Sequence, residues 1–202
     1  GAQAIALMAY GGKQIKKVSK IVGPGNIYVT AAKKIVFGKV GIDSLAGPSE
    51  IVVIADKTAN PKFIASDLIS QAEHDPNAKC MLITDDVDLA KDTIKDIFIQ
   101  LDSIKNEFND RFNSGMVSQC IKDNCKMIVC ESMEMVCKVS DIIAPEHLEI
   151  MTKEPFKTLE SVKNGGSIFL GNYTPVAVGD YMGGTNHVIP TGGNAVFSSP
   201  LG

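Results

Sequence analysis

The sequence predicts an α/β protein with mainly parallel sheets, arranged as two Rossmann-like units of which the first is incomplete. Short runs of apolar and β-branched residues alternate with longer stretches in which apolar residues recur at helical spacing. Alternating strands and helices favour a parallel sheet covered by helices. Glycine- and proline-rich breaks just before residue 50 interrupt this pattern. We therefore expect one unit over 1–50 and a second over 51–202.

The first unit is expected to contain two helices and one short strand. A helix over 2–10 precedes the strand KIVG at 20–23. The loop GPGN follows, and a second helix is predicted over about 26–37. Because few elements precede the breaks near residue 50, this unit is expected to be incomplete.

The second unit is expected to alternate strands with helices. The predicted strands are 51–55, 80–84, 126–130 and 167–171, and the predicted helices are 61–74, 86–101, about 132–143 and about 155–164. The helix at 61–74 has the clearest start, with Asn60 as N-cap and Pro61 at the first helical position. The tail over 183–202 is rich in Gly, Thr, Asn and Pro, and is expected to form ordered loops rather than core.

Composition excludes two classes of function. The 202 residues are 45% hydrophobic and carry a net charge of −3, as in an ordinary globular protein. Arg111 is the only arginine and the lysines are scattered, so nucleic acid is not an expected partner. No apolar run approaches the roughly 20 residues that span a bilayer, so no membrane segment is expected.

The cysteines are expected to be buried thiols in a reducing cytosol. The five are Cys80, Cys120, Cys125, Cys130 and Cys137. The C-x4-C-x4-C run that begins at Cys120 is compatible with zinc, but structural zinc sites usually have tighter spacing.

The GPGN loop has two interpretations. A strand followed by Gly-x-Gly at the start of a helix presents backbone N–H groups to an anion, such as the pyrophosphate of a dinucleotide. The full G-x-G-x-x-G pattern is absent, because no third glycine follows Gly25 at the required spacing. A tight structural turn explains the loop equally well.

Polar residues crowd the stretch SDLISQAEHDP at 66–76. In the predicted helix, Gln71 and His74 are three residues apart and share one face, with Ser70 and Glu73 nearby. A histidine and an oxygen ligand at this spacing are compatible with a metal, but two ligands do not make a site. A surface histidine beside solvated acids is the alternative.

Two further motifs place histidines next to acids or amides. In APEH, Glu146 and His147 follow a proline and are expected in a loop at the end of a helix, where they can act as two general acid–base groups or form a simple polar loop. In GDYMGGTNH, Asp180 follows a helical stretch and His187 lies in a glycine-rich loop. Together with His74, all three histidines fall at the ends of elements, which favours one shared site.

Six motifs, in this order along the chain, resemble the histidinol dehydrogenase family: GAQAIA, KIVGPGNIYV, AGPSEIVVIAD, SDLISQAEHDP, IAPEHLE and GDYMGGTNHVIPTGG…FSSPL. The resemblance runs from residue 1 to residue 202, and only 85–125 is not diagnostic. Members of this family are homodimers that oxidise L-histidinol through histidinaldehyde to L-histidine with NAD⁺ and a bound zinc. The resemblance implies a cytoplasmic dehydrogenase of histidine biosynthesis. It also implies that 1–50 is part of an NAD-binding domain and that 51–202 binds substrate and zinc.

The resemblance implies roles for individual residues. Gln71, His74 and Asp180 resemble zinc ligands, and Glu146 and His147 resemble the catalytic pair. His147 would take the hydroxyl proton of the alcohol, and Glu146 would activate water for the second oxidation. The implied substrate-binding residues are Ser49, Gln71, His74, His147, Asp180 and His187, and the implied NAD contacts are Gln3 and Asn26.

The resemblance also implies a fragment. The family begins with a long N-terminal segment, and past FSSPL it has a helical tail whose Glu binds substrate and whose His ligates zinc across the dimer. Neither segment lies between Gly1 and Gly202, so we expect this chain alone to be catalytically silent and to hold zinc poorly. Two alternatives stay open: a non-catalytic α/β fragment, and a zinc hydrolase with Glu146 as base, which leaves GPGN and Gln3 without a role.

Overall fold

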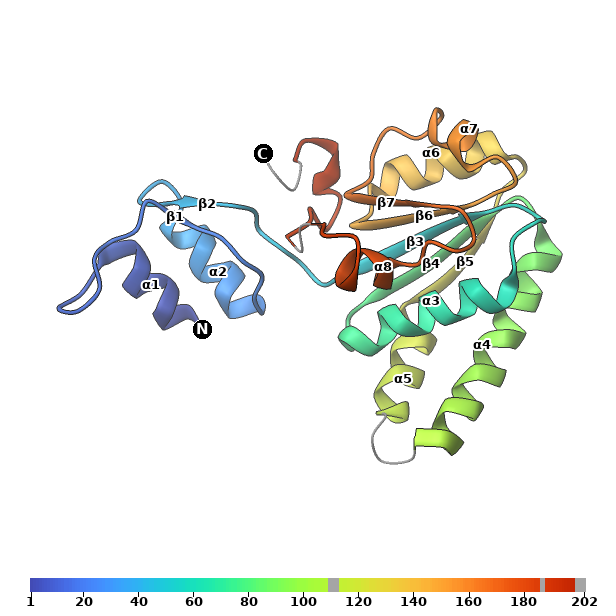
Figure 1. Cartoon of the computed structure of the whole chain (residues 1–202), viewed down its shortest axis with the longest axis horizontal. Helices are drawn as coiled ribbons and strands as arrows, with labels where there is room; N and C mark the ends of the chain where they lie inside the picture. Colours follow the sequence, from blue (N-terminus) through green and yellow to red (C-terminus); the bar gives the residue numbers. More distant parts are fainter. Residues whose placement is uncertain (109–112, 186–187, 199–202) are drawn as a thin grey trace.

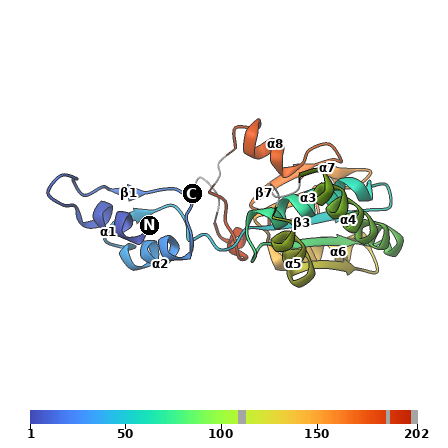
Figure 2. The same cartoon turned by 90° about the horizontal axis from the view of Figure 1, so that it is seen from below.

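The structure, a computed structural model, describes residues 1–108, 113–185 and 188–198. It contains a two-stranded and a five-stranded sheet, each parallel throughout, which confirms the predicted α/β class. Figures 1 and 2 show the two sheets in separate units that lie side by side, with the segment 43–49 running between them.

The N-terminal unit is small. Its elements are α1 (Ala2–Tyr10), β1 (Lys20–Ile21), α2 (Ile27–Val36) and β2 (Gly41–Ile42). Both helices confirm the predicted ones, whereas the strand is shorter than predicted and β2 was not predicted. The buried core of this unit consists of Ile5, Ala9, Ile21, Val36 and Val40. So few buried side chains give the unit little hydrophobic stabilisation of its own.

The larger unit is a doubly wound sheet. Its strands are β3 (Glu50–Ala55), β4 (Lys79–Thr84), β5 (Cys125–Val129), β6 (His147–Met151) and β7 (Ser167–Leu170). Its helices are α3 (Pro61–His74), α4 (Val87–Phe108), α5 (Ser114–Asn124), α6 (Met133–Ile143), α7 (Pro155–Leu159) and α8 (Val176–Tyr181). The spatial order β5-β4-β3-β6-β7 reverses direction between β3 and β6, which is the Rossmann strand order 3-2-1-4-5 without its sixth strand.

Helices cover both faces of this sheet. Figure 1 shows α3, α4 and α5 on one face and α6 and α7 on the other. Side chains of a strand alternate between faces, so in β3 Ile51, Val53 and Ala55 pack toward α3, while Val52 and Ile54 pack toward α6. The near-continuous apolar run of β3 is typical of a parallel strand buried on both sides.

The structure differs from the prediction at several elements. Helix α3 has the predicted bounds, and Asn60 accepts a hydrogen bond from Lys62 N–H as its N-cap. Helix α4 runs further than predicted and α7 ends earlier. The sequence analysis missed α5 and β6, and it predicted α8 only as a helical stretch of unstated bounds before Asp180. It placed His147 in a loop and Asp180 after a helix, whereas His147 begins β6 and Asp180 lies inside α8.

The C-terminal stretch forms loops, as expected, but it also contributes to the core. Its described part contains a short 3-10 helix (Asn194–Val196). Ile189 and Thr191 are buried, which the prediction of loops outside the core did not anticipate. Thr191 Oγ1 accepts a hydrogen bond from Gly47 N–H, so this stretch packs against the start of the larger unit.

All five cysteines are free thiols, three of them buried and two half-buried. Burial raises the pKa of each thiol, to about 11 in Cys125. Protonated thiols are poor zinc ligands, and the described residues contain no group of three His, Cys, Asp or Glu side chains arranged to hold a metal. Buried thiols are therefore the better interpretation of the cysteine run.

Membrane insertion of a helix finds no support in the structure. Over the described ranges, no helix combines the length and the apolar character needed to cross a bilayer. The longest helix, α4, carries charged residues along its exposed side.

Candidate active site

The residues singled out in the larger unit come together at one edge of its sheet. Ser49 directly precedes β3, and Glu146 directly precedes β6, whose first residue is His147. Strands β3 and β6 are neighbours, with Ile51 paired with His147. These residues therefore lie at the amino ends of the strands, at the point where the strand order reverses. Open α/β sheets more often bind ligands at the carboxyl ends.

Helices α3 and α8 bring polar residues to the same edge. Gln71, His74 and Asp180 line one small cavity of about 20 Å³ together with Asp67 and other residues. That volume holds a single occupant the size of a water molecule. His74 is the last residue of α3 and Asp180 is the last but one of α8, and the carbonyl-rich C-terminal ends of helices favour cations.

Gln71 supports a ligand in this cavity. Its side chain is buried, and its Nε2 has no hydrogen-bond partner among the described residues. An orphaned buried amide is costly. Because the two amide orientations differ only in how N and O are assigned, the reverse orientation would turn Oε1 toward the cavity. An oxygen there, a histidine nitrogen and a carboxylate form a plausible donor set for zinc.

The Gln71 amide also explains why this metal site is hard to recognise from clusters of His, Cys, Asp and Glu. Only two of its three predicted ligands are of the His, Cys, Asp or Glu type. Across the part of the chain that the structure describes, no three side chains of these four types are grouped to hold a metal. The zinc prediction therefore rests on a mixed donor set.

Glu146 is held in a fixed position by the chain that precedes it. Helix α6 ends at Ile143, and Ala144 then adopts a left-handed conformation with φ 47° and ψ 61°. Glycine is the usual residue at such a helix end, because it has no Cβ to clash. The turn directs Pro145 and Glu146 into β6. Pro145 O and Glu146 O accept hydrogen bonds from the backbone that leads into β7, which fixes the segment on both sides.

Burial raises the pKa of Glu146 to about 7. The Glu50 N–H donates to Glu146 Oε2 at 3.1 Å, and this bond and one with the Ser49 side chain act in the opposite direction. The carboxylates of Glu50 and Asp180 raise the pKa further. An acid with a pKa near neutrality can both accept and release a proton at physiological pH.

His147 lies beside Glu146 and is itself buried. Its Nδ1 is 3.7 Å from Glu146 Oε2. Its ring lies 6.3 Å from the Phe169 ring at 44°, so one wall of the imidazole is aromatic. The structure therefore brings Glu146, His147 and Ser49 together, and the influence of Asp180 on Glu146 connects them to the cavity. His187, the remaining predicted residue of this group, lies outside the described residues.

The two predicted NAD contacts lie in the N-terminal unit. Gln3 is exposed in the first turn of α1, and Asn26 is exposed at the start of α2. Asn26 Oδ1 accepts a hydrogen bond from Val29 N–H at 3.2 Å, as a helix N-cap does.

An internal ion pair organises the GPGN loop. Asp43 accepts hydrogen bonds from Gly23 N–H at 2.7 Å and from the buried Lys33 Nζ at 2.5 Å, and Lys33 Nζ also donates to Gly23 O. Gly23 has φ 127°, which favours glycine, and a Cβ on Gly25 would come within 2.5 Å of Val29. The N–H groups of Gly23 and Val29 thus bind side chains of the protein and are not available to an anion. This supports the interpretation of the loop as a structural turn. At the start of α2, the N–H groups of Ile27 and Tyr28 come before the first intrahelical hydrogen bond and are left without an intrahelical partner.

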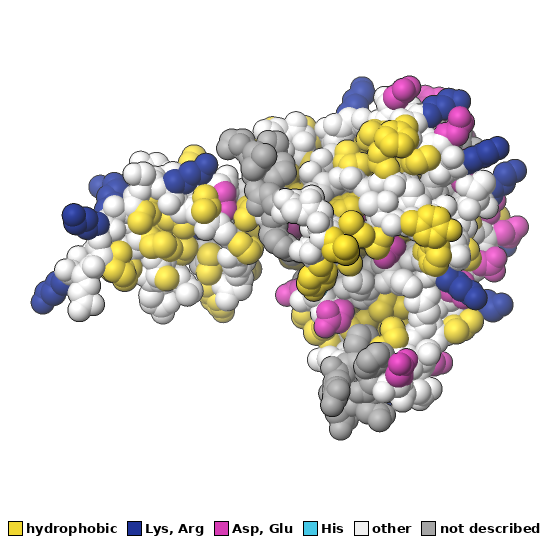
Figure 3. Space-filling view, in the orientation of Figure 1, with side chains coloured by type: hydrophobic (Ala, Val, Ile, Leu, Met, Phe, Trp, Pro, Cys, Tyr) yellow, Lys and Arg dark blue, Asp and Glu magenta, His cyan; other side chains and the backbone are white. Residues whose placement is uncertain are grey.

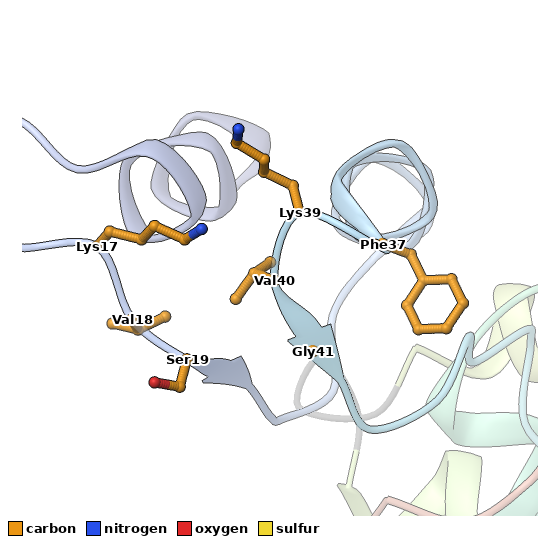
Figure 4. Close-up of a pocket in the computed structure, with 8 residues that line it drawn as sticks. Lys17, Val18, Ser19, Phe37, Lys39, Val40 and Gly41 are labelled. Atoms are coloured by element: carbon orange, nitrogen blue, oxygen red, sulfur yellow. The ribbon is translucent and has the colours of Figure 1, made fainter.

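The N-terminal unit also has a pocket, and none of the predicted site residues lines it. It has a volume of about 410 Å³ and lies between the segments 17–19 and 37–41. Figure 4 shows Lys17 and Lys39 on its rim, with the Phe37 ring turned away. Neither Gln3 nor Asn26 lines it.

Three acidic residues near the site were not assigned a role from the sequence. Glu50 and Glu149 are buried in β3 and β6, and Asp67 lines the small cavity. Glu50 accepts from Gly192 N–H at 2.9 Å and lies 3.6 Å from Lys79 Nζ. The available signal was an acid inside an apolar strand, as in EIVVIA and HLEIM, because buried carboxylates are rare without partners.

The sequence of this chain matches one family of known proteins. A sequence model of the histidinol dehydrogenase family matches residues 1–202. The histidinol dehydrogenase of Clostridium acetobutylicum is 49% identical over 201 residues, and the alignment covers 100% of this chain and 45% of that protein. The enzyme of Bacillus cereus (strain ATCC 14579) is 51% identical with the same coverage.

A solved structure extends this similarity to the fold. The crystal structure of histidinol dehydrogenase from Elizabethkingia anophelis superimposes with a TM-score of 0.89 at 41% sequence identity. The match covers 98% of this chain and 44% of that one. The chain thus spans about 45% of the length of the curated relatives it matches.

Proposed function

Because this chain belongs to the histidinol dehydrogenase family, we propose that it contributes the acid–base and zinc-binding residues of an NAD-dependent L-histidinol dehydrogenase. The reaction would oxidise the alcohol to histidinaldehyde and then to L-histidine. The observation that carries this proposal is the Glu146–His147 pair, with Glu146 poised at a pKa of about 7, beside the cavity lined by Gln71, His74 and Asp180.

Each proposed proton transfer has a residue suited to it. The imidazole of His147 would accept the hydroxyl proton of the alcohol, a role that its buried position beside Glu146 supports. The second oxidation consumes water, and Glu146 would take the proton of that water onto its carboxylate. Ser49, which bonds with Glu146, would contact the substrate from the same edge of the sheet.

The donor set supports zinc, and the N-terminal unit gives weaker support for NAD. Gln71, His74 and Asp180 would hold the metal, since an orphaned buried amide meets a histidine and a carboxylate in one cavity. Gln3 and the start of α2 at Asn26 would contact the dinucleotide. When bound, these two groups supply polarisation of the substrate oxygen and uptake of hydride.

The test is NADH formation from L-histidinol in the presence of zinc by the protein as its gene encodes it. We expect activity that Glu146→Gln lowers by about 10²- to 10⁴-fold. Glu134→Gln is the matched control, because Glu134 is an exposed acid paired with Lys138 on α6, away from the strand edge. Zinc-dependent turnover of a hydrolase substrate without NAD⁺ would instead support the zinc hydrolase interpretation.

We also propose a cytoplasmic homodimer, on the basis of the family. Apolar side chains are exposed on both units in the face that Figure 3 shows. On and next to α2, Ile27, Tyr28, Ile35 and Phe37 are each more than two-thirds exposed, at 77%, 72%, 78% and 68%. Exposed apolar surface of this kind is commonly covered by protein. Light scattering at several protein concentrations measures whether the protein is a dimer.

A further inference from the structure

Glu50 is a buried acid at the start of β3 that has no role in the proposed function. It is 2% exposed and directly follows Ser49. Its side chain has two partners: Oε1 accepts the Gly192 N–H at 2.9 Å, and Oε2 lies 3.6 Å from Lys79 Nζ. A buried carboxylate needs such partners, and these two come from different parts of the larger unit.

The backbone of Glu50 holds the proposed base. The Glu50 N–H donates to Glu146 Oε2 at 3.1 Å. That N–H belongs to the same peptide group as Ser49 O, which accepts the Lys79 N–H at 3.1 Å. Because a peptide group is planar, a hydrogen bond to its oxygen also sets the direction of its N–H. The contact with β4 therefore directs the Glu50 N–H toward Glu146.

The side chains of Glu50 and Lys79 strengthen this contact. The Lys79 N–H binds Ser49 O, and the Lys79 ammonium group faces the Glu50 carboxylate. The two strands are thus joined through both backbone and side chain, at the point where β3 begins and the segment 43–49 ends. The end of an element frays easily where few contacts hold it, so the side chain of Glu50 limits motion of its own N–H.

Glu50 also holds the C-terminal stretch against the same edge of the sheet. The Gly192 N–H donates to its carboxylate, and the Gly47 N–H donates to Thr191 Oγ1. Thr191 is buried, as is Ile189 two residues earlier. These two hydrogen bonds attach the segment 189–192 to the residues at the start of β3.

The segment 189–192 packs directly against the backbone of Glu146. Gly166 lies between them, and a Cβ added there would come within 2.5 Å of Ile189 Cγ2 and 2.6 Å of Glu146 O. Only a residue without a side chain fits in this space. Glu50 thus contacts Glu146 through its N–H, and through its carboxylate it holds a segment that packs on Glu146.

We propose that Glu50 is a positioning residue for Glu146. It fixes the peptide group whose N–H binds the Glu146 carboxyl group, and it holds the segment 189–192 beside that residue. Glu50 exchanges no proton with the substrate and acts only through Glu146. This inference rests on the proposed function for the role of Glu146 as a base, whereas the hydrogen bonds of Glu50 are properties of the fold.

Glutamine at position 50 separates the hydrogen bond from the charge. Glu50→Gln keeps an oxygen that accepts the Gly192 N–H, whereas Glu50→Leu has a similar volume and removes this acceptor. Both variants remove the charge that faces Lys79. Glu50→Asp is the second route if the leucine variant does not fold, because its side chain is one methylene shorter and its carboxylate no longer reaches Gly192.

Asp56→Leu is the matched control. Asp56 directly follows the opposite end of β3, where its Oδ2 accepts the Lys153 N–H at 2.8 Å. Like Glu50, it binds the backbone of a distant segment through a carboxylate. It lies at the carboxyl end of the strand, away from Glu146.

Oxidation of histidinol and of histidinaldehyde, each supplied separately, is measured with the protein as its gene encodes it. A displacement of about 1 Å in a catalytic group can cost about 10²-fold in rate, and we expect this loss in the aldehyde step of Glu50→Leu. The alcohol step should slow less, because Glu146 is the proposed base of the aldehyde step. Glu50→Gln should recover most of the rate, and Asp56→Leu should leave both steps near wild type.

Hydrogen exchange of the Gly192 amide tests the contact itself, independently of the reaction. Exchange should accelerate in Glu50→Leu, because the Gly192 N–H loses its acceptor, and should stay at the wild-type rate in Glu50→Gln. Asp56→Leu should not change it.

The two measurements separate the positioning role from the proposed function. Equal slowing of both steps in Glu50→Leu would overturn the role, because a purely structural defect does not select one step. Equal losses in Glu50→Gln and Glu50→Leu, or wild-type aldehyde oxidation in Glu50→Leu, would also overturn it. If the wild-type protein forms no NADH from histidinol, the proposed function is wrong and the exchange of Gly192 decides. Faster exchange in the leucine variant alone would then support the positioning role, and unchanged exchange would overturn it.

Discussion

At the scale of single residues, the site is built from acids that the fold removes from water. Burial is the largest influence on Glu146, Asp67 and Glu149, and in each it raises the pKa. A buried carboxylate is costly unless it is paired or protonated. Backbone N–H groups offset part of this cost, from Glu50 to Glu146 and from Val176 to Glu149. Glu146, with a pKa of about 7, can therefore hold or release a proton near neutral pH.

Burial of Glu146 predicts a specific pH dependence of stability. Its folded pKa is about 7 against an ordinary value of 4.5, so the folded state binds more protons between these values. Stability is then present below the ordinary pKa and is lost as pH rises through 7. Relative to wild type, Glu146→Gln should therefore gain about 2 kcal/mol of unfolding free energy between pH 5 and pH 8.

Urea unfolding of both proteins at the two pH values measures this gain. Glu134→Gln is the control, because Glu134 is exposed and the hydrogen bond from Lys138 lowers its pKa, so it does not titrate between pH 5 and pH 8. The same difference between wild type and Glu146→Gln at both pH values would show that Glu146 is not buried as described.

The two catalytic candidates should differ in the step that they affect. Glu146→Gln should impair oxidation of histidinaldehyde more than oxidation of histidinol, because only the second step consumes water, and loss of a general base costs about 10²- to 10⁴-fold. His147→Asn should slow both steps, since a proton leaves in each. Rates measured with each substrate supplied separately decide this. Near-wild-type turnover of the aldehyde by Glu146→Gln would contradict the assignment of the base.

At the scale of elements, the sequence predicted those with strong local signals. Helix α3 has an N-cap, a proline at its first position and a regular apolar face, and its bounds were predicted correctly. Strand β6 was missed because Glu149 and His147 make it look like a polar loop, and their burial depends on partners distant in sequence. Helix α8 was predicted only as a helical stretch without bounds, because it is six residues long and contains Gly179. Short elements form through tertiary packing, which local sequence does not encode.

The residues of the candidate site also divide into those that the local sequence identified and those that only the fold brings together. Motifs and the resemblance singled out Gln71, His74 and Asp180, and the structure places them around one cavity. The acids that support the site were not predicted, because their role depends on contacts across the sheet. Glu50 and Glu146 are 96 residues apart in sequence and meet only in the fold.

Packing of α8 on β7 predicts the effect of filling Gly179. A Cβ there would come within 2.8 Å and 2.9 Å of the Phe169 ring. Because overpacking of this kind typically costs about 1–3 kcal/mol, Gly179→Ala should destabilise the fold by that amount. It should also weaken zinc binding, since Asp180 is the next residue.

Gly115→Ala is the matched control for this change. Gly115 is exposed in α5, and the nearest atom to an added Cβ is 3.9 Å away. Alanine there should stabilise the protein by about 0.4–1 kcal/mol, because it reduces the entropy of the unfolded chain. Urea unfolding and a zinc titration of the two variants measure both effects. Equal stability changes in the two variants would mean that α8 does not lie on Phe169 as described.

At the scale of the whole molecule, the two units have separate cores. The two large buried clusters lie on the two faces of the five-stranded sheet, and the third lies in the N-terminal unit. Among the described residues, no buried cluster contains side chains from both units. The proposed catalytic and metal-binding residues lie with the large cores, whereas the proposed NAD contacts lie with the small one. The proposed catalytic and metal-binding site thus belongs to the unit with the larger core.

This division predicts that the larger unit folds by itself. Its first residue should be Gly47, because Gly47 N–H bonds to Thr191 and Glu50 accepts from Gly192 N–H, so these contacts belong to the larger unit. A polypeptide of residues 47–202 should therefore unfold in one cooperative urea transition with native-like circular dichroism. A polypeptide of residues 1–46 should be largely unfolded, because five buried apolar side chains cannot offset the entropy of ordering it. If 47–202 instead showed no cooperative transition, the small unit would have to stabilise the large one through the segment 43–49.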